Sequence, residues 1–159
     1  MICLWKYESP LGQITMAGEG EALVGLWLEG QKHFASTLGP DAVEGWLPVF
    51  GETCRWLDIY FSGAQPDFTP RLDLRGTPFR RTVWEQLLTI PYGVTISYGE
   101  LARRIAASPR AVGGAVGHNP VSLVVPCHRV IGADGHLTGY AGGLDLKARL
   151  LQLEKGGGR

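Results

Sequence analysis

The chain has 159 residues, of which 45% are hydrophobic, and its 15 basic and 15 acidic side chains cancel at neutral pH. This length fits one domain or two small ones, and the composition can bury an ordinary core. No apolar run approaches the roughly 18 residues of a membrane span. The first ten residues include acidic Glu8 and do not resemble a signal peptide. We therefore expect a cytoplasmic protein without a membrane partner.

The three cysteines, Cys3, Cys54 and Cys127, are too few and too irregularly spaced for a closed disulfide framework. Cys3, His33 and Cys54 could be considered as zinc ligands, but no CxxC or HxxxH pair supports them. Small buried cysteines, one in a strand and one in a helix, are the more common case. The sequence therefore predicts no metal site.

The charge is divided unevenly along the chain. Residues 1–75 carry five basic and ten acidic side chains, a net charge of −5, whereas residues 76–159 carry a net charge of +5. A polyanion would be attracted to the second half and repelled by the first. Chance can produce the same segregation in a chain of this size, so charge alone supports nucleic-acid binding only weakly.

The first half is predicted to form a small α/β domain, residues 1–75. Its elements are three strands over 2–7, 13–17 and 22–28, a helix over 41–62 and a possible short strand over 71–74. The turn sequences SPLG and GEGE between the strands indicate an antiparallel meander. Because this half contains no cluster of catalytic residue types, we interpret it as a scaffold.

The second half, residues 76–159, is predicted to be a mostly helical domain, which makes the whole an α+β protein of the broad α/β class. Ser97 and Glu100 form a capping box at the start of one of its helices. Its predicted elements are helices over 77–90, 97–106, 110–120 and from 144 onward, an extended apolar segment over 121–132, a hairpin turn at 133–136 and a loop over 139–143.

The helices over 97–106 and 110–120 have helix-turn-helix proportions. The second helix carries only small side chains where a recognition helix usually presents long polar ones. Its two adjacent glycines cost roughly 2 kcal/mol of helix propensity relative to alanine. Close packing against another helix would explain one glycine. With Arg110 at its start, however, a smooth helix also suits the narrow minor groove of DNA, where the arginine could enter the base stack. These small residues are Ala111, Val112, Gly113, Gly114 and Ala115.

The stretch VVPCHRVIG, residues 124–132, places a cysteine beside a histidine in an apolar run. Lowering a thiol pKa by two units takes roughly 2.7 kcal/mol, which an imidazole or backbone N–H groups can supply. Neighbouring residues on a regular strand point to opposite faces. His128 therefore reaches Cys127 only if Pro126 introduces a turn, or through a water, with a carboxylate such as Glu154 orienting its other nitrogen. A structural cysteine beside a structural histidine remains the alternative.

The motifs TPFRRTVWEQLL, IPYG, ISYGELA, PCHRV and GYAGG, in this order, resemble the O6-alkylguanine-DNA alkyltransferases, a family of DNA repair proteins. The similarity covers residues 77–155. It implies a methylated-DNA–protein-cysteine methyltransferase that takes the alkyl group from O6-alkylguanine in double-stranded DNA and acts once. It also implies nucleotide flipping and no cofactor, and we expect a monomer.

The resemblance also implies a role for several residues. Cys127 would accept the alkyl group, and His128 and Glu154 would form the relay that activates it. Asn119 would hold the turn before the active-site segment, and Tyr98 would donate a proton to the leaving base.

The same resemblance implies which residues meet the DNA. Arg110 would fill the space of the extruded nucleotide, and the helix over 111–117 would lie in the minor groove. Val130, Tyr140 and Ala141 would line the base pocket.

Two other interpretations stay open from the residues alone. The first is a non-catalytic helix-turn-helix module that binds DNA and in which Cys127 is structural. The second is a cysteine hydrolase using Cys127 and His128. The hydrolase is less favoured because the sequence shows no motif for an oxyanion hole.

Overall fold

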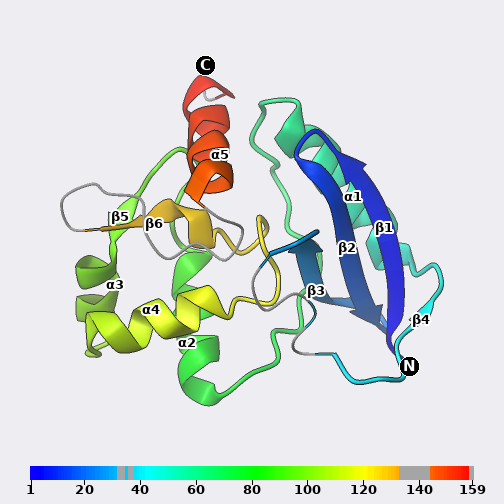
Figure 1. Ribbon diagram of the computed structural model, residues 1–159, viewed down its shortest axis with the longest axis horizontal. Coiled ribbons are helices and arrows are strands. Elements are labelled where there is room, and N and C mark those ends of the chain that lie inside the picture. The colour runs from blue at the N-terminus through cyan, green and yellow to red at the C-terminus, as the bar shows by residue number, and fades with distance from the viewer. Residues whose placement is uncertain (32–34, 36–37, 133–143, 158–159) are drawn as a thin grey trace.

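The computed structural model describes residues 1–31, 35, 38–132 and 144–157. A four-stranded sheet with the order β3-β2-β1-β4 lies to one side of the molecule, and most of the helices lie to the other (Figure 1). Strands β1 (Cys3–Ser9), β2 (Gly12–Glu19) and β3 (Ala22–Leu28) form an antiparallel meander. The predicted strands and the α/β class are therefore confirmed.

The helix that follows the sheet begins later than the predicted range of 41–62. Residues Val43–Glu44 form strand β4, which pairs in parallel with β1, and helix α1 spans Pro48–Phe61. Pro48 occupies the first turn of α1, where its missing N–H and fixed φ favour helix initiation. The aromatic spacing that extended the prediction includes Trp46, which instead packs edge-on against Trp5 of β1 with ring centroids 5.0 Å apart.

Three helices of the second half begin at hydroxyl side chains, as the sequence predicted for two of them. Thr77, Ser97 and Ser108 each accept a hydrogen bond from the backbone N–H three residues later, which satisfies one of the free donors of a first turn. The helices of this half are α2 (Pro78–Leu87), α3 (Tyr98–Arg104), α4 (Pro109–Gly117) and α5 (Leu144–Gly157).

The predicted extended segment over 121–132 is wrong for most of its length. Residues 121–125 form turns in which Leu123 has a φ of 71°, and Cys127–Arg129 form a single 3-10 turn, η1. Only β6 (Val130–Ile131) is extended, and it pairs in parallel with β5 (Ile96–Ser97). Pro126 precedes η1 and lacks the N–H that a strand ladder needs. The predicted strand over 71–74 is reduced to a bridge between Leu23 and Leu72.

One hydrophobic cluster runs through both halves of the chain. It joins Ile14 and Phe50 of the first half to Trp84, Val116 and Leu150 of the second. Backbone bonds reinforce this contact, because the edge of β3 pairs with residues 120–122. The sheet therefore supports the segment that leads into η1.

Two further predicted features, the turn at 133–136 and the loop over 139–143, lie outside the described residues. Within the described ranges, no helix has the length and apolar character needed to cross a bilayer.

Candidate active site and nucleic-acid interface

Cys127 lies at the start of η1 and is only 4% exposed. Its backbone N–H donates to the carbonyl of Val125 at 2.8 Å, and the N–H of Arg129 donates to Pro126 at 3.0 Å. The chain is therefore turned, not extended, at this point. The turn that the sequence analysis required at Pro126 is confirmed.

Asn119 closes the loop that precedes the cysteine. Its Nδ2 donates to the carbonyl of Val125 at 2.8 Å, and its Oδ1 accepts from the N–H of Val121 at 3.0 Å. Because both ends of the carboxamide bind backbone groups, residues 121–125 are fixed as a closed turn. This geometry fits the position that the resemblance implied for Asn119.

Glu154 of α5 is the centre of a buried polar network and is 1% exposed. Its Oε2 accepts from His128 Nε2 at 2.5 Å and from the Tyr60 hydroxyl at 2.7 Å. Its Oε1 accepts from Arg129 Nε at 2.8 Å and from the Gly93 N–H at 3.1 Å. The predicted pairing of His128 with Glu154 is thus present, and the carboxylate has several further donors.

The network sets the protonation of both partners. Burial raises the pKa of Glu154, but hydrogen bonds from His128 and Arg129 outweigh it and hold that pKa at about 2. Burial lowers the pKa of His128, and Glu154 opposes this only in part. At neutral pH, therefore, a charged carboxylate faces a neutral imidazole. Because a carboxylate only accepts, Nε2 carries the hydrogen, and the buried Nδ1 is the atom that can take up a proton.

The pKa of the Cys127 thiol is raised, whereas the sequence analysis considered how neighbouring groups could lower it. Burial raises the pKa of Cys127 to about 11, although Asn119 and Lys147 act in the opposite direction. The sequence showed the neighbours of the sulfur but not how completely the fold removes it from water. The resting site therefore holds a protonated thiol, and reaction requires a base that accepts its proton during attack.

Lys147 is a buried cation to which the sequence analysis assigned no role. Its Nζ donates to the carbonyl of Val130 at 2.5 Å and lies 5.8 Å from the centroid of the Tyr98 ring. Burial lowers the pKa of Lys147 to about 8, and the nearby Cys127 opposes this shift. A positive charge at this place favours the thiolate over the thiol.

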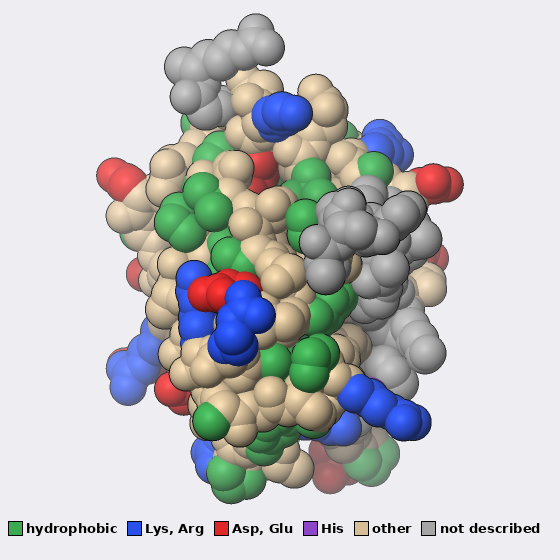
Figure 2. Space-filling view, turned by 90° about the vertical axis from the view of Figure 1, so that its left-hand side faces the viewer, with side chains coloured by type: hydrophobic (Ala, Val, Ile, Leu, Met, Phe, Trp, Pro, Cys, Tyr) green, Lys and Arg blue, Asp and Glu red, His purple; other side chains and the backbone are tan. Residues whose placement is uncertain are grey.

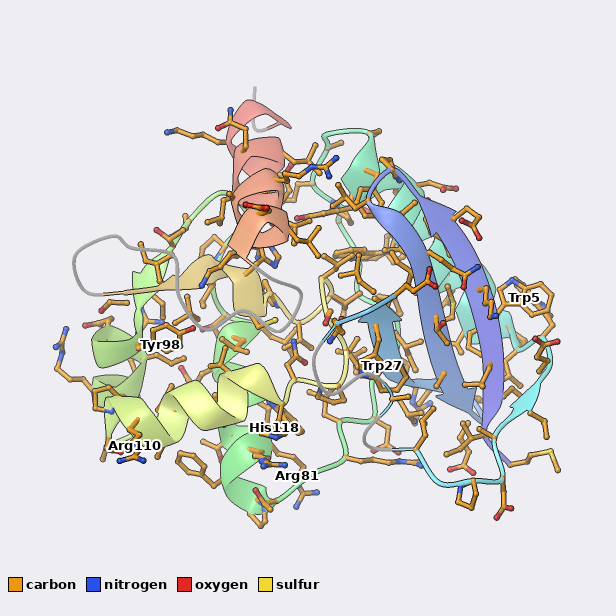
Figure 3. The ribbon with its side chains drawn as sticks, viewed as in Figure 1. Trp5, Trp27, Arg81, Tyr98, Arg110 and His118 are labelled. Atoms are coloured by element: carbon orange, nitrogen blue, oxygen red, sulfur yellow. The ribbon has the colours of Figure 1, made fainter. Side chains whose placement is uncertain are left out.

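Tyr98 begins α3 directly after β5, and β5 pairs with β6 directly after η1. This small sheet brings Tyr98 and Val130 to the same region as the cysteine, and Tyr98 lies on the inner side of α3 (Figure 3). Val130 is fully buried. Tyr140 and Ala141, the other two residues expected in the base pocket, lie outside the described residues.

Helix α4 presents a smooth outer face. A Cβ built on Gly114 would meet no described atom within 4 Å, and one on Gly113 would only approach the Tyr98 ring at 4.0 Å. Packing against another helix therefore does not explain Gly114. Val112 and Ala115 are buried, so their side chains belong to the core and not to the outer face, contrary to the expectation that 111–115 contact DNA as a set. Arg110, Ala111 and Gly114 remain exposed.

A groove runs between α4 and the start of α2. Figure 3 shows Arg110 and His118 at opposite ends of α4, with Arg81 of α2 on the same side of the molecule. On the face that carries α3, Lys and Arg side chains project at several places (Figure 2). Asp and Glu side chains lie among them, but the described lining of the groove includes two arginines and no carboxylate, which suits a polyanion. The groove is lined by Thr77, Phe79, Arg80, Ser108, Arg110, Ala111, Gly114, Ala115 and His118.

Sequence reasoning missed two members of the buried network, Tyr60 and Arg129, and assigned no role to Lys147 nearby. A signal existed for Arg129, because an arginine inside an apolar run must find a buried partner. For Tyr60, a hydroxyl on the apolar face of a helix was the corresponding signal. Neither signal identifies the partner.

Comparison with known proteins identifies the family. The family model described as 6-O-methylguanine DNA methyltransferase, DNA binding domain, matches residues 78–156, and its ribonuclease-like domain matches residues 4–74. The methylated-DNA–protein-cysteine methyltransferases of Mycobacterium tuberculosis and Mycobacterium leprae are 49% and 47% identical over 160 residues, which covers 98% of this chain and 93% of each relative. The chain belongs to the 6-O-methylguanine DNA methyltransferase family.

Structures of the 6-O-methylguanine DNA methyltransferase family agree with this assignment. The crystal structure of Mycobacterium tuberculosis OGT in complex with DNA matches with a TM-score of 0.86 and 47% identity, covering 96% of this chain and 92% of that one. The crystal structure of Mycobacterium tuberculosis O6-methylguanine methyltransferase matches with a TM-score of 0.84 and 47% identity, covering 98% of this chain and 93% of that one. The resemblance inferred from the ordered motifs is therefore confirmed.

Proposed function

We propose that this protein repairs double-stranded DNA by moving the alkyl group of O6-alkylguanine irreversibly to its own Cys127. The observation that carries the proposal is the buried thiol beside a neutral His128 that Glu154 holds through Nε2. In the step, the thiol proton passes through a water to His128 Nδ1. The sulfur then attacks the alkyl carbon in line, and the bond from that carbon to guanine O6 breaks.

The products balance without a further reactant. A carbon–sulfur bond replaces the carbon–oxygen bond, and the base keeps the electron pair and gains the proton that the thiol lost. Tyr98 would donate to N3 of the leaving base and recover its proton from His128. Because the thioether is inert, each molecule reacts once, and the step requires neither a metal nor an organic cofactor.

The target atom lies inside a duplex, so the nucleotide has to be extruded before attack. The smooth face of α4, open above Gly114, supports docking in the minor groove, with Arg110 in place of the extruded base. The basic side chains of the second half and the DNA-bound structure of the Mycobacterium tuberculosis relative support DNA as the partner. Val130, Tyr140 and Ala141 would line the pocket for the flipped guanine.

We assign residues 1–75 to a supporting α/β domain and residues 76–159 to the domain that binds DNA and accepts the alkyl group. The protein would act as a monomer in the cytoplasm.

Intact-mass spectrometry after mixing with a duplex that contains O6-methylguanine tests this function. The wild-type protein should gain one methyl group, mapped to the peptide that holds Cys127. Cys127→Ser should gain none and still bind DNA, whereas Cys54→Ser, a control on α1, should behave like wild type. DNA binding by the wild type without any mass gain would instead identify a non-catalytic helix-turn-helix module.

A further inference from the structure

The first half of the chain contributes a side chain to the buried network. Tyr60 of α1 is fully buried, and its hydroxyl donates to Oε2 of Glu154 at 2.7 Å. The same hydroxyl lies 3.4 Å from Nε2 of His128. Tyr60 and His128 therefore meet at one oxygen of one carboxylate, although 68 residues separate them along the chain.

The ring of Tyr60 is held firmly in this position. It stacks on Trp56 with centroids 5.2 Å apart and an interplanar angle of 11°. Tyr92 and Phe61 approach it edge-on, at 6.2 Å and 5.5 Å. Because aromatic neighbours fix the ring, the hydroxyl has little freedom, and removing its oxygen alone would leave the packing in place.

We propose that Tyr60 is a positioning residue for alkyl transfer, whose hydroxyl holds Oε2 of Glu154 in line with His128. This inference rests on the function proposed above. The scaffold half is then part of the active site, and the relay contains four side chains from three separate parts of the chain: Tyr60, His128, Arg129 and Glu154.

The hydroxyl also controls how strongly Glu154 acts on the imidazole. Oε2 accepts from three donors, His128 Nε2, the Tyr60 hydroxyl and, at 3.2 Å, Arg129 Nη2, and these donors share its negative charge. Without the Tyr60 hydroxyl, Oε2 would interact more strongly with His128, and the protonated imidazole would be favoured. The other charged groups that act on His128 are Arg129 beside it and Lys147 on α5, both cationic. Arg129 Nη2 already donates to Oε2 at 3.2 Å, but this bond comes from η1 and is present in the wild type, so it does not replace the bond that α1 supplies.

The test compares Tyr60→Phe with Tyr7→Phe. Tyr7 is a matched control because its hydroxyl also bonds to a carboxylate on α1, that of Asp58, but outside the network. The single-turnover rate of methyl transfer from duplex DNA is measured across the pH range in which histidine titrates. For Tyr60→Phe we expect a rate about tenfold lower at neutral pH, and an acidic limb displaced to higher pH. The acidic limb moves to higher pH because transfer requires neutral His128, and the pKa of His128 rises in this variant.

Two outcomes would overturn the proposal. One is a rate within about twofold of wild type with an unmoved acidic limb. The other is a lower rate and a lower melting temperature with the limb unmoved, which is the behaviour of a residue that only packs. Tyr7→Phe should match wild type in rate and limb.

Nuclear magnetic resonance titration of the His128 ring separates this inference from the proposed function. If the wild type transfers no methyl group, the proposed function fails. A higher His128 pKa in Tyr60→Phe would still support the positioning role, and an unchanged pKa would refute it.

Discussion

The two functional regions of the molecule are built in opposite ways. Around Glu154, the side chains of Tyr60, His128 and Arg129 all donate to one buried carboxylate, and the charged guanidinium of Arg129 lies 2.8 Å from it. Over α4, the outer face is exposed and nearly free of side chains, with a single arginine at its start. The difference shows that proton transfer needs fixed groups away from water, whereas docking on a long polymer needs an unobstructed surface.

Among the substitutions that test this difference, Glu154→Gln should have the largest effect. It keeps the shape of the side chain but removes its charge. Arg129 would be left as a buried cation without its carboxylate, which typically costs about 3 to 5 kcal/mol of stability. His128 would lose the charged acceptor that stabilises its protonated form during transfer, so transfer should slow by about 100-fold or more. Urea unfolding and single-turnover rates measure the two effects. Glu100→Gln, at an exposed ion pair, is the control and should change little.

The pH dependence of this variant gives a further check on the same substitution. Glu154 has a pKa of about 2 in the folded protein, below its ordinary value of 4.5, so its contribution is present above 4.5 and is lost as pH falls toward 2. The lowered pKa of His128 acts in the same direction, because the unfolded chain binds a proton first. The free energy of unfolding of the wild type should therefore fall on acidification. Below pH 4.5 it should fall less steeply in Glu154→Gln than in the wild type. Equal slopes would contradict the assigned charge state.

On the docking side, Arg110→Ala should slow repair of duplex DNA by about tenfold while leaving the reaction with free O6-methylguanine base near wild type. The reason is that only the duplex requires extrusion of a nucleotide. Rates on both substrates are compared in parallel. Arg71→Ala, which removes an exposed arginine from the sheet side, is the control. Equal losses on both substrates would remove the proposed role of Arg110.

The smallest effects are expected at Gly114, where substitution by alanine and by leucine should change different properties. Gly114→Ala should raise the stability of the helix by about 0.5 to 1 kcal/mol, because alanine loses less backbone entropy. Gly114→Leu should also fold, since its Cβ meets no described atom within 4 Å, but it should weaken duplex binding several-fold. Thermal melting and fluorescence anisotropy follow the two properties. Unchanged binding by the leucine variant would mean that α4 does not face the DNA closely.

Local sequence signals predicted much of this molecule. Caps at Thr77 and Ser97 and the turn at Pro126 depend on neighbouring residues only, and each is present. The pairing of His128 with Glu154 was predicted because the motifs of the family carry it. The turns before Cys127 were predicted wrongly as an extended segment, because they depend on the carboxamide of Asn119 and on the edge of β3.

The properties that escaped prediction all depend on burial. The thiol pKa of about 11 and the lysine pKa of about 8 arise because Cys127 and Lys147 are enclosed by segments distant in sequence. Tyr60 was interpreted as part of a scaffold because its charged neighbour in the chain, Asp58, is not its partner and bonds to Tyr7 instead. A partner 94 residues away becomes visible only after α1 and α5 are packed together.

The backbone bonds between β3 and the segment before η1 limit how far this protein can be shortened. Leu26 donates to Pro120 at 2.8 Å and accepts from Ser122 at 2.9 Å, so the meander acts as a brace for the loop that carries the sulfur. A shortened protein made of residues 76–159 alone would expose the apolar surface that the sheet now covers, and polar substitutions there would not be enough. It would also need another strand edge to pair with residues 120–122. Without one, the loop before Cys127 would lose its conformation and the thiol its reactivity.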